Sequence, residues 1–204
     1  MEKLEIYHPD KFYPSRTFII YSTVVLLLFL SFILQEFGFD HNTAIFDGVV
    51  YLALFCFICG MVIKLFSLGK YKPLYGKLSG EIHFLKDSIR IQEEIIPIDK
   101  VEKIEFKGSD WLGLFEPNRF SLENGLSNGT KNWLIVYLND SSQRKIRFQK
   151  FEACQLALFQ EVLLEYYVNG KISYLQMVDN LCLETPEEWN RLKSLKKRTT
   201  TNKT

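Results

Sequence analysis

Two long apolar runs constrain this chain more than any other feature of its sequence. No charged residue occurs between Phe18 and Leu34, and none occurs between Gly48 and Ile63. An α-helix needs roughly 20 mainly apolar residues to cross a hydrocarbon core about 30 Å thick. We therefore predict a transmembrane helical hairpin over residues 18–68, with spans of about 18–37 and 43–66.

The charges beside these runs predict the topology of the hairpin. Its connector, residues 35–42, contains Glu36 and Asp40 but neither Lys nor Arg, whereas Lys11 and Arg16 precede the first run. The lysines that close or follow the second run are Lys64, Lys70, Lys72 and Lys77. Because Lys and Arg accumulate on the cytoplasmic side of a membrane, we expect both termini in the cytoplasm.

Two alternatives to a membrane hairpin stay open at this stage. A cleaved signal peptide is disfavoured, because a long segment of mixed charge precedes the run and no small-residue cleavage site follows Leu34. A pair of buried core helices is possible, since each run is shorter than an ideal span. Cys56 and Cys59 lie one helical turn apart in the second run, where we interpret them as small apolar residues and not as a metal or redox pair.

Charge and cysteine content exclude some classes of protein. The formal net charge is +1, so the whole chain gives no electrostatic reason to expect a nucleic-acid partner. The four cysteines among 204 residues lie in apolar surroundings and do not resemble a disulfide-dense secreted scaffold. We therefore expect a reducing, cytoplasmic setting.

From residue 74 onward the pattern changes to that of a water-soluble β domain. The stretch GEIHFLKDSIRI, Gly80 to Ile91, alternates apolar and polar residues around a turn and predicts a hairpin with one wet face. The stretch IIPIDKVEKIEF, residues 95–106, continues the apolar set, and its Pro97 favours an edge or strand-end position. Residues 133–138 are apolar on both faces and predict a central strand, followed by a final strand over 145–148.

Helical periodicity follows the strands. We predict a helix over 151–168 that stops at Asn169 and Gly170, a second short helix over 172–183, and a third that begins after Thr185. Thr185 and Glu188 have the spacing of a capping box. The third helix leads into a basic tail.

The order of these segments resembles the bacterial PH-like family of membrane-anchored domains. The resemblance covers residues 18–168 and rests on an apolar hairpin, the pattern G-x-I-x-F-x-x-D-x-I-x-I, the strand IPIDKVEKIEF, further strands and a closing helix. It implies an α+β membrane protein: a two-helix transmembrane hairpin, then an antiparallel β-sandwich or open barrel with a C-terminal capping helix. The expected division is a cytoplasmic segment 1–17, the hairpin 18–68, a PH-like domain 74–170, and a helical extension with a basic tail, 171–204.

No constellation for catalysis or metal binding is evident in the sequence. His8 and His83 are expected on the opposite side of the membrane from His41, and His83 is predicted to be exposed on the polar face of a strand. No nucleophile, zinc or phosphate-loop motif occurs. We therefore predict a non-enzymatic protein with no cofactor, no metal and no small-molecule substrate.

Two surfaces are candidates for contact with a partner or with lipid. The first is an apolar cluster in the loop 107–131, which could enter the membrane surface, fill a partner's pocket or fold back on its own domain. Its residues are Trp111, Leu112, Leu114 and Phe115. The second is a basic run that could meet an anionic leaflet, or could simply favour the C-terminal end of its helix dipole. Its residues are Arg191, Lys193, Lys196, Lys197 and Arg198.

The function predicted from these patterns is binding and not chemistry. We expect a multi-pass protein of the inner membrane that presents a cytoplasmic domain for protein binding or assembly, with the bilayer and a protein partner or second copy as its contacts. The alternative is a small regulatory or immunity subunit that binds a toxin or an adjacent membrane enzyme.

Overall fold

The chain divides into two compact units, each described here by itself. The computed structural model describes residues 3–11, 13–37, 44–117 and 120–201, except for the side chains of 196–201. The first unit, which we call the sheet unit, comprises residues 1–9, 76–114 and 128–204. The second, which we call the helical unit, comprises residues 10–75 and 115–127.

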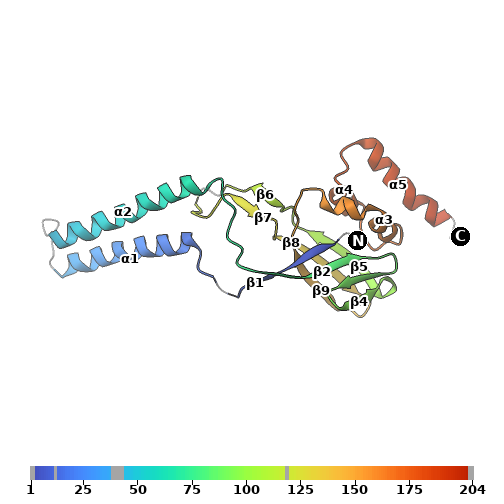
Figure 1. Ribbon diagram of the computed structural model, residues 1–204, viewed down its shortest axis with the longest axis horizontal. Coiled ribbons are helices and arrows are strands. Elements are labelled where there is room, and N and C mark those ends of the chain that lie inside the picture. Colours follow the sequence, from blue (N-terminus) through green and yellow to red (C-terminus); the bar gives the residue numbers. More distant parts are fainter. Residues whose placement is uncertain (1–2, 12, 38–43, 118–119, 202–204) are drawn as a thin grey trace. The chain divides into compact units, whose positions relative to one another are not determined.

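The sheet unit is built on one antiparallel sheet (Figure 1). Its strand order is β4-β3-β2-β1-β9-β8-β5. The bounds are β1 Leu4–Pro9, β2 Gly76–Phe84, β3 Ser88–Ile91, β4 Glu94–Pro97, β5 Val101–Lys107, β8 Asn132–Leu138 and β9 Gln143–Phe148. Two shorter strands, β6 Leu112–Phe115 and β7 Leu126–Asn128, pair separately.

The N-terminal strand β1 holds the sheet together, and the sequence analysis missed it. Residues 1–17 were expected to be a segment preceding the membrane hairpin, yet β1 lies at the centre of the sheet (Figure 1). On one side Leu4 pairs with Ile82 of β2, and on the other Ile6 pairs with Phe148 of β9. The whole stretch from residue 10 to 75 is thus inserted between two strands that are neighbours in the sheet.

Helices close one side of the core of the sheet unit. These are α3 Gln160–Val168, α4 Tyr174–Asn180 and α5 Pro186–Thr201, preceded by the 3-10 turns η1 Ile98–Lys100 and η2 Gln155–Phe159. Phe84 meets Phe106 and Phe159 edge to face, at centroid distances of 5.8 and 5.2 Å. The Tyr166 hydroxyl donates to the carbonyl of Leu85, and burial raises the pKa of this phenol. The closing helix is therefore fixed to the turn after β2 by packing and by a buried polar contact.

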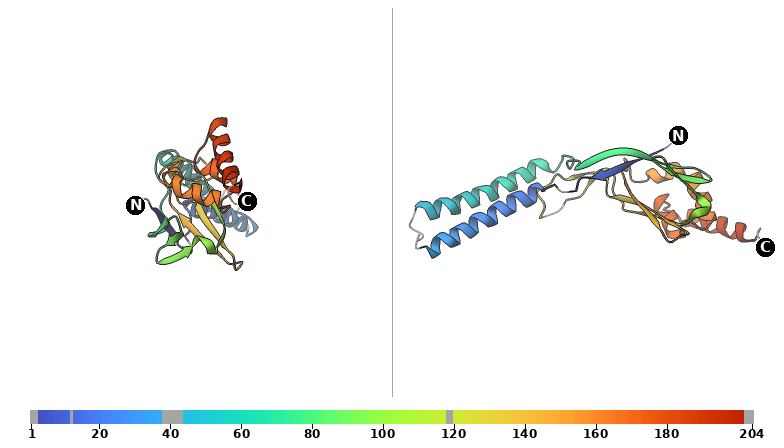
Figure 2. Two further views of the ribbon diagram at one scale, coloured as in Figure 1. Left: turned by 90° about the vertical axis from the view of Figure 1, so that its right-hand side faces the viewer. Right: turned by 90° about the horizontal axis from the view of Figure 1, so that it is seen from below.

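The helical unit contains two antiparallel helices that lie side by side (Figure 2). They are α1 Arg16–Glu36 and α2 Ala44–Ser67. Both are long and apolar enough to cross a membrane, but only 6% and 11% of their most apolar stretches are buried. They are therefore not core helices of this chain, which was one of the two alternatives.

Most of the expected strands and helices are present, with shifted ends. The hairpin over Gly80 to Ile91 is confirmed as β2 and β3, although β2 begins at Gly76. Pro97 ends the edge strand β4, as expected. The helix expected over 151–168 begins only at residue 160, as α3, and is preceded by a turn and by η2. The capping box at the start of α5 is confirmed, because the Glu188 N–H donates to the Thr185 hydroxyl at 3.3 Å and the Thr185 N–H donates to the Glu188 carboxylate at 3.0 Å.

Candidate functional site

The apolar cluster in the loop 107–131 is only partly exposed. Trp111, Leu112 and Leu114 are half-buried, whereas 52% of Phe115 is exposed. The Leu112 N–H donates to the carbonyl of Lys150 at 2.8 Å, within the sheet unit. Three positions were considered for this cluster. Its residues up to Leu114 fold back on their own domain, whereas Phe115 is exposed.

Buried polar groups hold the base of this loop in the sheet unit. Asn132 is fully buried, and its side-chain amide donates to the carbonyls of Asp110 at 2.9 Å and Gly129 at 2.8 Å. Gly129 has φ +69, and a Cβ at this position would lie 2.1 Å from the Lys150 carbonyl oxygen. Burial lowers the pKa of the Lys150 ammonium, and the nearby Asp110 carboxylate acts in the opposite direction. This end of the loop is thus rigidly placed.

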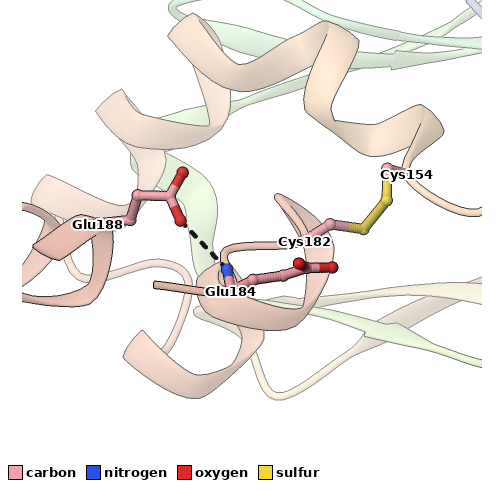
Figure 3. Close-up of a disulfide and its surroundings, with 4 residues drawn as sticks. All are labelled: Cys154, Cys182, Glu184 and Glu188. Carbon is pink, nitrogen blue, oxygen red and sulfur yellow. Dashed lines mark hydrogen bonds between the residues drawn. A yellow bond between two sulfur atoms is a disulfide. The ribbon is translucent and has the colours of Figure 1, made fainter. Parts of the chain in front are cut away.

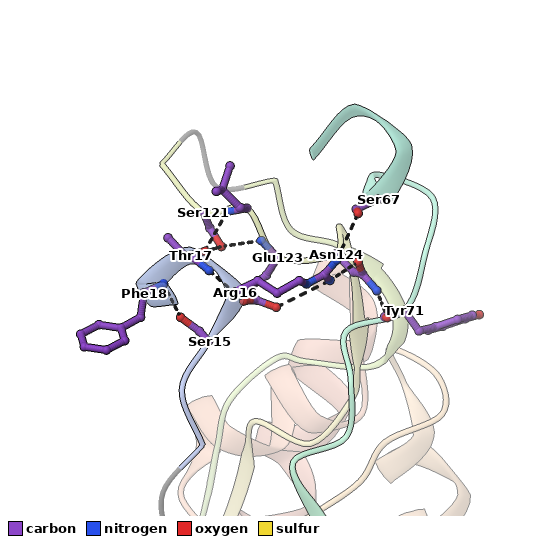
Figure 4. A network of polar contacts seen from close by, with 10 residues as sticks. Ser15, Arg16, Thr17, Phe18, Ser67, Tyr71, Ser121, Glu123 and Asn124 are labelled. Atoms are coloured by element: carbon purple, nitrogen blue, oxygen red, sulfur yellow. Dashed lines mark hydrogen bonds and ion pairs between the residues drawn. The ribbon is translucent and has the colours of Figure 1, made fainter. Parts of the chain in front are cut away.

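Residues 115–127 contact the ends of the two long helices (Figure 4). The Arg16 guanidinium donates to Asn124 and lies 3.8 Å from the Glu123 carboxylate. The Leu122 N–H donates to the Thr17 hydroxyl at 2.8 Å. We call this set of contacts the polar collar. The Thr17 N–H also donates to the Glu123 carboxylate at 3.4 Å, so the collar gives a partner to one of the first-turn N–H groups that have none within the helix.

The end of α2 enters the same collar. The Gly125 N–H donates to the carbonyl of Ser67 at 3.1 Å, and the Asn124 side chain donates to the carbonyl of Tyr71. Lys72 and Glu116 form an ion pair at 2.8 Å. One loop segment therefore connects the start of α1 to the end of α2, which are 51 residues apart in sequence.

An apolar contact lies beside the polar collar. Leu122 is 2% exposed, and its Cδ1 would lie 3.2 Å from a Cβ added to Gly60 of α2. Ile20 of α1 is equally close to that position. The absence of a side chain at Gly60 therefore allows the two helices and the loop to meet, as small residues do at packed helix interfaces.

The basic run in α5 is only partly described. Arg191 and Lys193 are exposed, and the Lys193 ammonium lies 5.1 Å from the centre of the Tyr174 ring. The side chains of Lys196, Lys197 and Arg198 lie outside the described residues. Leu192 is 2% exposed and anchors the helix to the core.

A disulfide joins Cys154 and Cys182, where the sequence analysis expected reduced cysteines (Figure 3). Cys182 has φ 52 just after α4, and its N–H donates to Asp179 while that of Leu183 donates to Val178. This pair of hydrogen bonds is a Schellman motif, in which glycine usually takes the left-handed position. The helix end therefore presents Cys182 to Cys154, which is exposed at the surface. Cys56 and Cys59 are free.

His83 is buried, so its predicted exposure was wrong. It is 7% exposed, its Nε2 lies 3.0 Å from the Glu81 carboxylate, and its Nδ1 has no hydrogen-bond partner. It lines a cavity of about 410 Å³ together with Leu158 and Glu161, because the end of η2 and the start of α3 cover this face of β2. The alternation of apolar and polar residues along β2 does not reveal that residues distant in sequence cover its polar face. His41 lies outside the described residues.

Within the part of the chain that the structure describes, no group of three or more His, Cys, Asp or Glu residues could hold a metal ion. Comparison with known proteins gives no assignment either: no family model, no curated protein and no solved structure matches the chain.

Proposed function

We propose that this chain is an integral membrane protein whose helical hairpin anchors the sheet unit at one face of the membrane, where that unit binds a protein partner. The observation that carries the proposal is the pairing of β1 with β2. These strands precede α1 and follow α2, and they are antiparallel neighbours, with His8 opposite Lys77. Both ends of the hairpin must therefore return to the same side.

The surface of the hairpin supports a lipid environment. Large apolar side chains point outward around both helices, including Leu26 at 66% and Phe55 at 63% exposure. Soluble monomers rarely expose contiguous apolar patches larger than a few hundred Å². The central place of β1 also argues against a cleaved signal peptide, because cleavage after Leu34 would remove a strand from the middle of the sheet.

The order of the strands supports a PH-like fold. Four strands, β1 to β4, form one meander, and β5, β8 and β9 form another, with β1 joining the two and helix α3 following the last strand. In this arrangement the hairpin is an insertion between the first two strands, and the loop 107–131 is an insertion between β5 and β8. We propose a binding role for the unit, since a fold alone does not define an activity.

We place the sheet unit in the cytoplasm, at the inner membrane. The excess of Lys and Arg beside the helices favours this side. The Cys154–Cys182 bond points to an oxidising compartment, because disulfides are rare in the cytosol. A direct measurement of topology resolves these two opposing observations.

Cysteine labelling in intact cells tests the topology. A cysteine replaces Phe37, at the end of α1, or Glu102 on β5, in a chain with Cys56→Ala and Cys59→Ala. A maleimide that cannot cross membranes should label Phe37→Cys from outside, whereas Glu102→Cys should react only after permeabilisation. The chain with Cys56→Ala and Cys59→Ala but no added cysteine is the control for background labelling of Cys154 and Cys182. Labelling of Glu102→Cys from outside would overturn the cytoplasmic placement, and labelling of both sites from outside would overturn the hairpin.

Partner binding is tested by purification from the native membrane in mild detergent. Phe115→Ala should reduce recovery of the co-purifying partner, because Phe115, the residue that directly follows the sheet-unit segment 76–114, is the exposed end of the loop cluster. Phe151→Ala is a matched control, since the two phenylalanines are 52% and 49% exposed. Equal recovery with both variants would exclude Phe115 as the contact. A partner recovered in a fixed ratio would favour the regulatory-subunit role.

A further inference from the structure

A small groove on the sheet unit, which we call the basic groove, has the chemistry of an anion site. It has a volume of about 290 Å³ and is lined by residues of β1, β3, β8, β9 and the turn after β3. Lys145 and Arg147 of β9 line it, and none of its lining residues carries a carboxylate. Ligand sites in proteins usually measure about 300 to 1,000 Å³, so the groove suits a small group.

The two cations of the groove have no acidic partner. Neither Lys145 nor Arg147 forms an ion pair with any carboxylate in the described residues. Neighbouring cations differ in this respect: Arg144, also on β9, pairs with Glu94 at 3.1 Å, and Lys103 on β5 pairs with Glu105 at 2.6 Å. Among the described residues, the two positive charges of the groove are therefore not compensated by an ion pair.

Aromatic rings hold these cations in place. The Lys145 ammonium lies 4.3 Å from the centre of the Trp133 ring, and the Arg147 guanidinium lies 5.0 Å from that of Tyr7 and 5.2 Å from that of Trp133. The Arg147 Nε donates to the carbonyl of Thr130 at 3.3 Å, which fixes the orientation of the guanidinium. Cations fixed before binding lose less side-chain entropy when a ligand arrives.

Two further polar side chains, those of His8 and Gln92, line the groove. His8 Nε2 donates to the carbonyl of Ser79 at 3.0 Å, and the Gln92 side-chain nitrogen lies 3.3 Å from the same ring nitrogen. Gln92 has φ 56, in a two-residue hairpin turn where glycine or asparagine is usual. Gly80 leaves room for it, since a Cβ there would lie 2.5 Å from Gln92 Cγ. A non-glycine residue in the left-handed region of backbone conformation thus lines the groove.

We propose that the basic groove binds a phosphate group, as the free ion or as a phosphate ester. Arginine presents a planar fork of N–H groups that matches phosphate oxygens, and lysine adds a point charge. Nucleobases are disfavoured as the recognised group, because the cations already cover the ring faces on which bases would stack. The phosphate could belong to a soluble ester or to a lipid head group, and these sources share the same chemistry.

Titration calorimetry on the full chain in neutral detergent tests this proposal, with inorganic phosphate and glycerol phosphate as probes. The double substitution Lys145→Gln and Arg147→Gln should weaken binding by roughly tenfold or more, as expected when hydrogen bonds to charged groups are lost. The matched control is Lys103→Gln with Lys107→Gln, which removes the same charge from strand β5, where both lysines pair with Glu105. It should change the affinity little.

A conservative variant and two lipid compositions complete the test. Arg147→Lys keeps the charge but loses the fork, so it should give a smaller loss than the double substitution. The source of phosphate is distinguished by reconstitution in phosphatidylcholine or phosphatidylglycerol bilayers. If phosphatidylglycerol lowers the affinity for soluble phosphate, and the double substitution abolishes this lowering, the lipid head group is the source. If the affinity is the same in the two bilayers, the source is a soluble phosphate compound. Failure of either probe to bind the unmodified chain, or an equal loss in the matched control, would overturn the proposal.

Discussion

The sheet unit and the helical unit use the same apolar residue types in opposite ways. Leu134 and Ile104 in the sheet unit are fully buried, whereas Leu26 and Leu65 on the long helices are 66% and 68% exposed. Burial of a leucine is worth about 1.5 to 3 kcal/mol in water. The sheet unit gains this free energy on folding, whereas the exposed leucines of the long helices do not. This difference supports the proposal that lipid covers the two long helices.

The largest expected effect comes from making one substitution in both units. Leu134→Ala should destabilise the sheet unit by about 2 to 5 kcal/mol, since it leaves a cavity in a packed core. Leu26→Ala removes the same atoms from an exposed position and should change stability by less than about 0.5 kcal/mol. Urea unfolding in neutral detergent, followed by far-ultraviolet circular dichroism, measures both, because the signal includes the helices of each unit. Similar losses would mean that the helix surface is packed against protein.

The disulfide is the second way to test the difference between the units. Replacing Cys154 and Cys182 by Ser should cost about 3 to 4 kcal/mol from the loop-closure entropy of a bridge between residues 28 apart. Replacing Cys56 and Cys59 by Ser, in the helical unit, is the control and should leave the unfolding of the sheet unit unchanged. Reduction of the disulfide in the unmodified chain should cause the same loss of stability as the Cys154 and Cys182 substitutions. Unchanged stability after reduction would show that the bond does not stabilise the fold.

The third test places a charge on each exposed surface. Leu26→Arg should reduce membrane integration, because an arginine at the centre of a span costs about 2.5 to 3.5 kcal/mol on insertion scales. Leu175→Arg is the matched control, since Leu175 is 72% exposed on α4 of the sheet unit and should accept the charge. The fraction of chain that resists alkaline extraction from membranes measures the effect. Normal integration of Leu26→Arg would contradict the span.

The smallest expected effect concerns acid stability of the sheet unit. Hydrogen bonds from Lys103, Lys107 and Tyr137 lower the pKa of the Glu105 carboxylate below its ordinary value of 4.5. A lowered pKa in the folded state stabilises the fold above the unfolded-state pKa, and this contribution is lost as the pH falls through the folded-state pKa. Glu105→Gln should therefore reduce the loss of stability on acidification, in urea unfolding followed below pH 4.5. Glu102→Gln, exposed on the same strand, is the control and should retain the full dependence.

The sequence by itself determined the features that depend on local pattern. The charge-free runs predicted two helices of the observed length, alternation predicted β2 and β3, and Thr185 with Glu188 predicted the start of α5. Each of these signals lies within a few residues of the structure it specifies, so neighbouring residues are enough to read it.

Only the tertiary structure decided the features that depend on distant residues. Leu4 and Ile6 became a central strand because β2 and β9 offered them partners, and His83 became buried because η2 and α3 cover it. The bond between Cys154 and Cys182, the polar collar around Arg16, and the basic groove likewise assemble side chains from segments far apart in the chain. A short strand, an isolated histidine or a single cysteine has no local sequence signal that identifies its partner, and only folding brings that partner within contact distance.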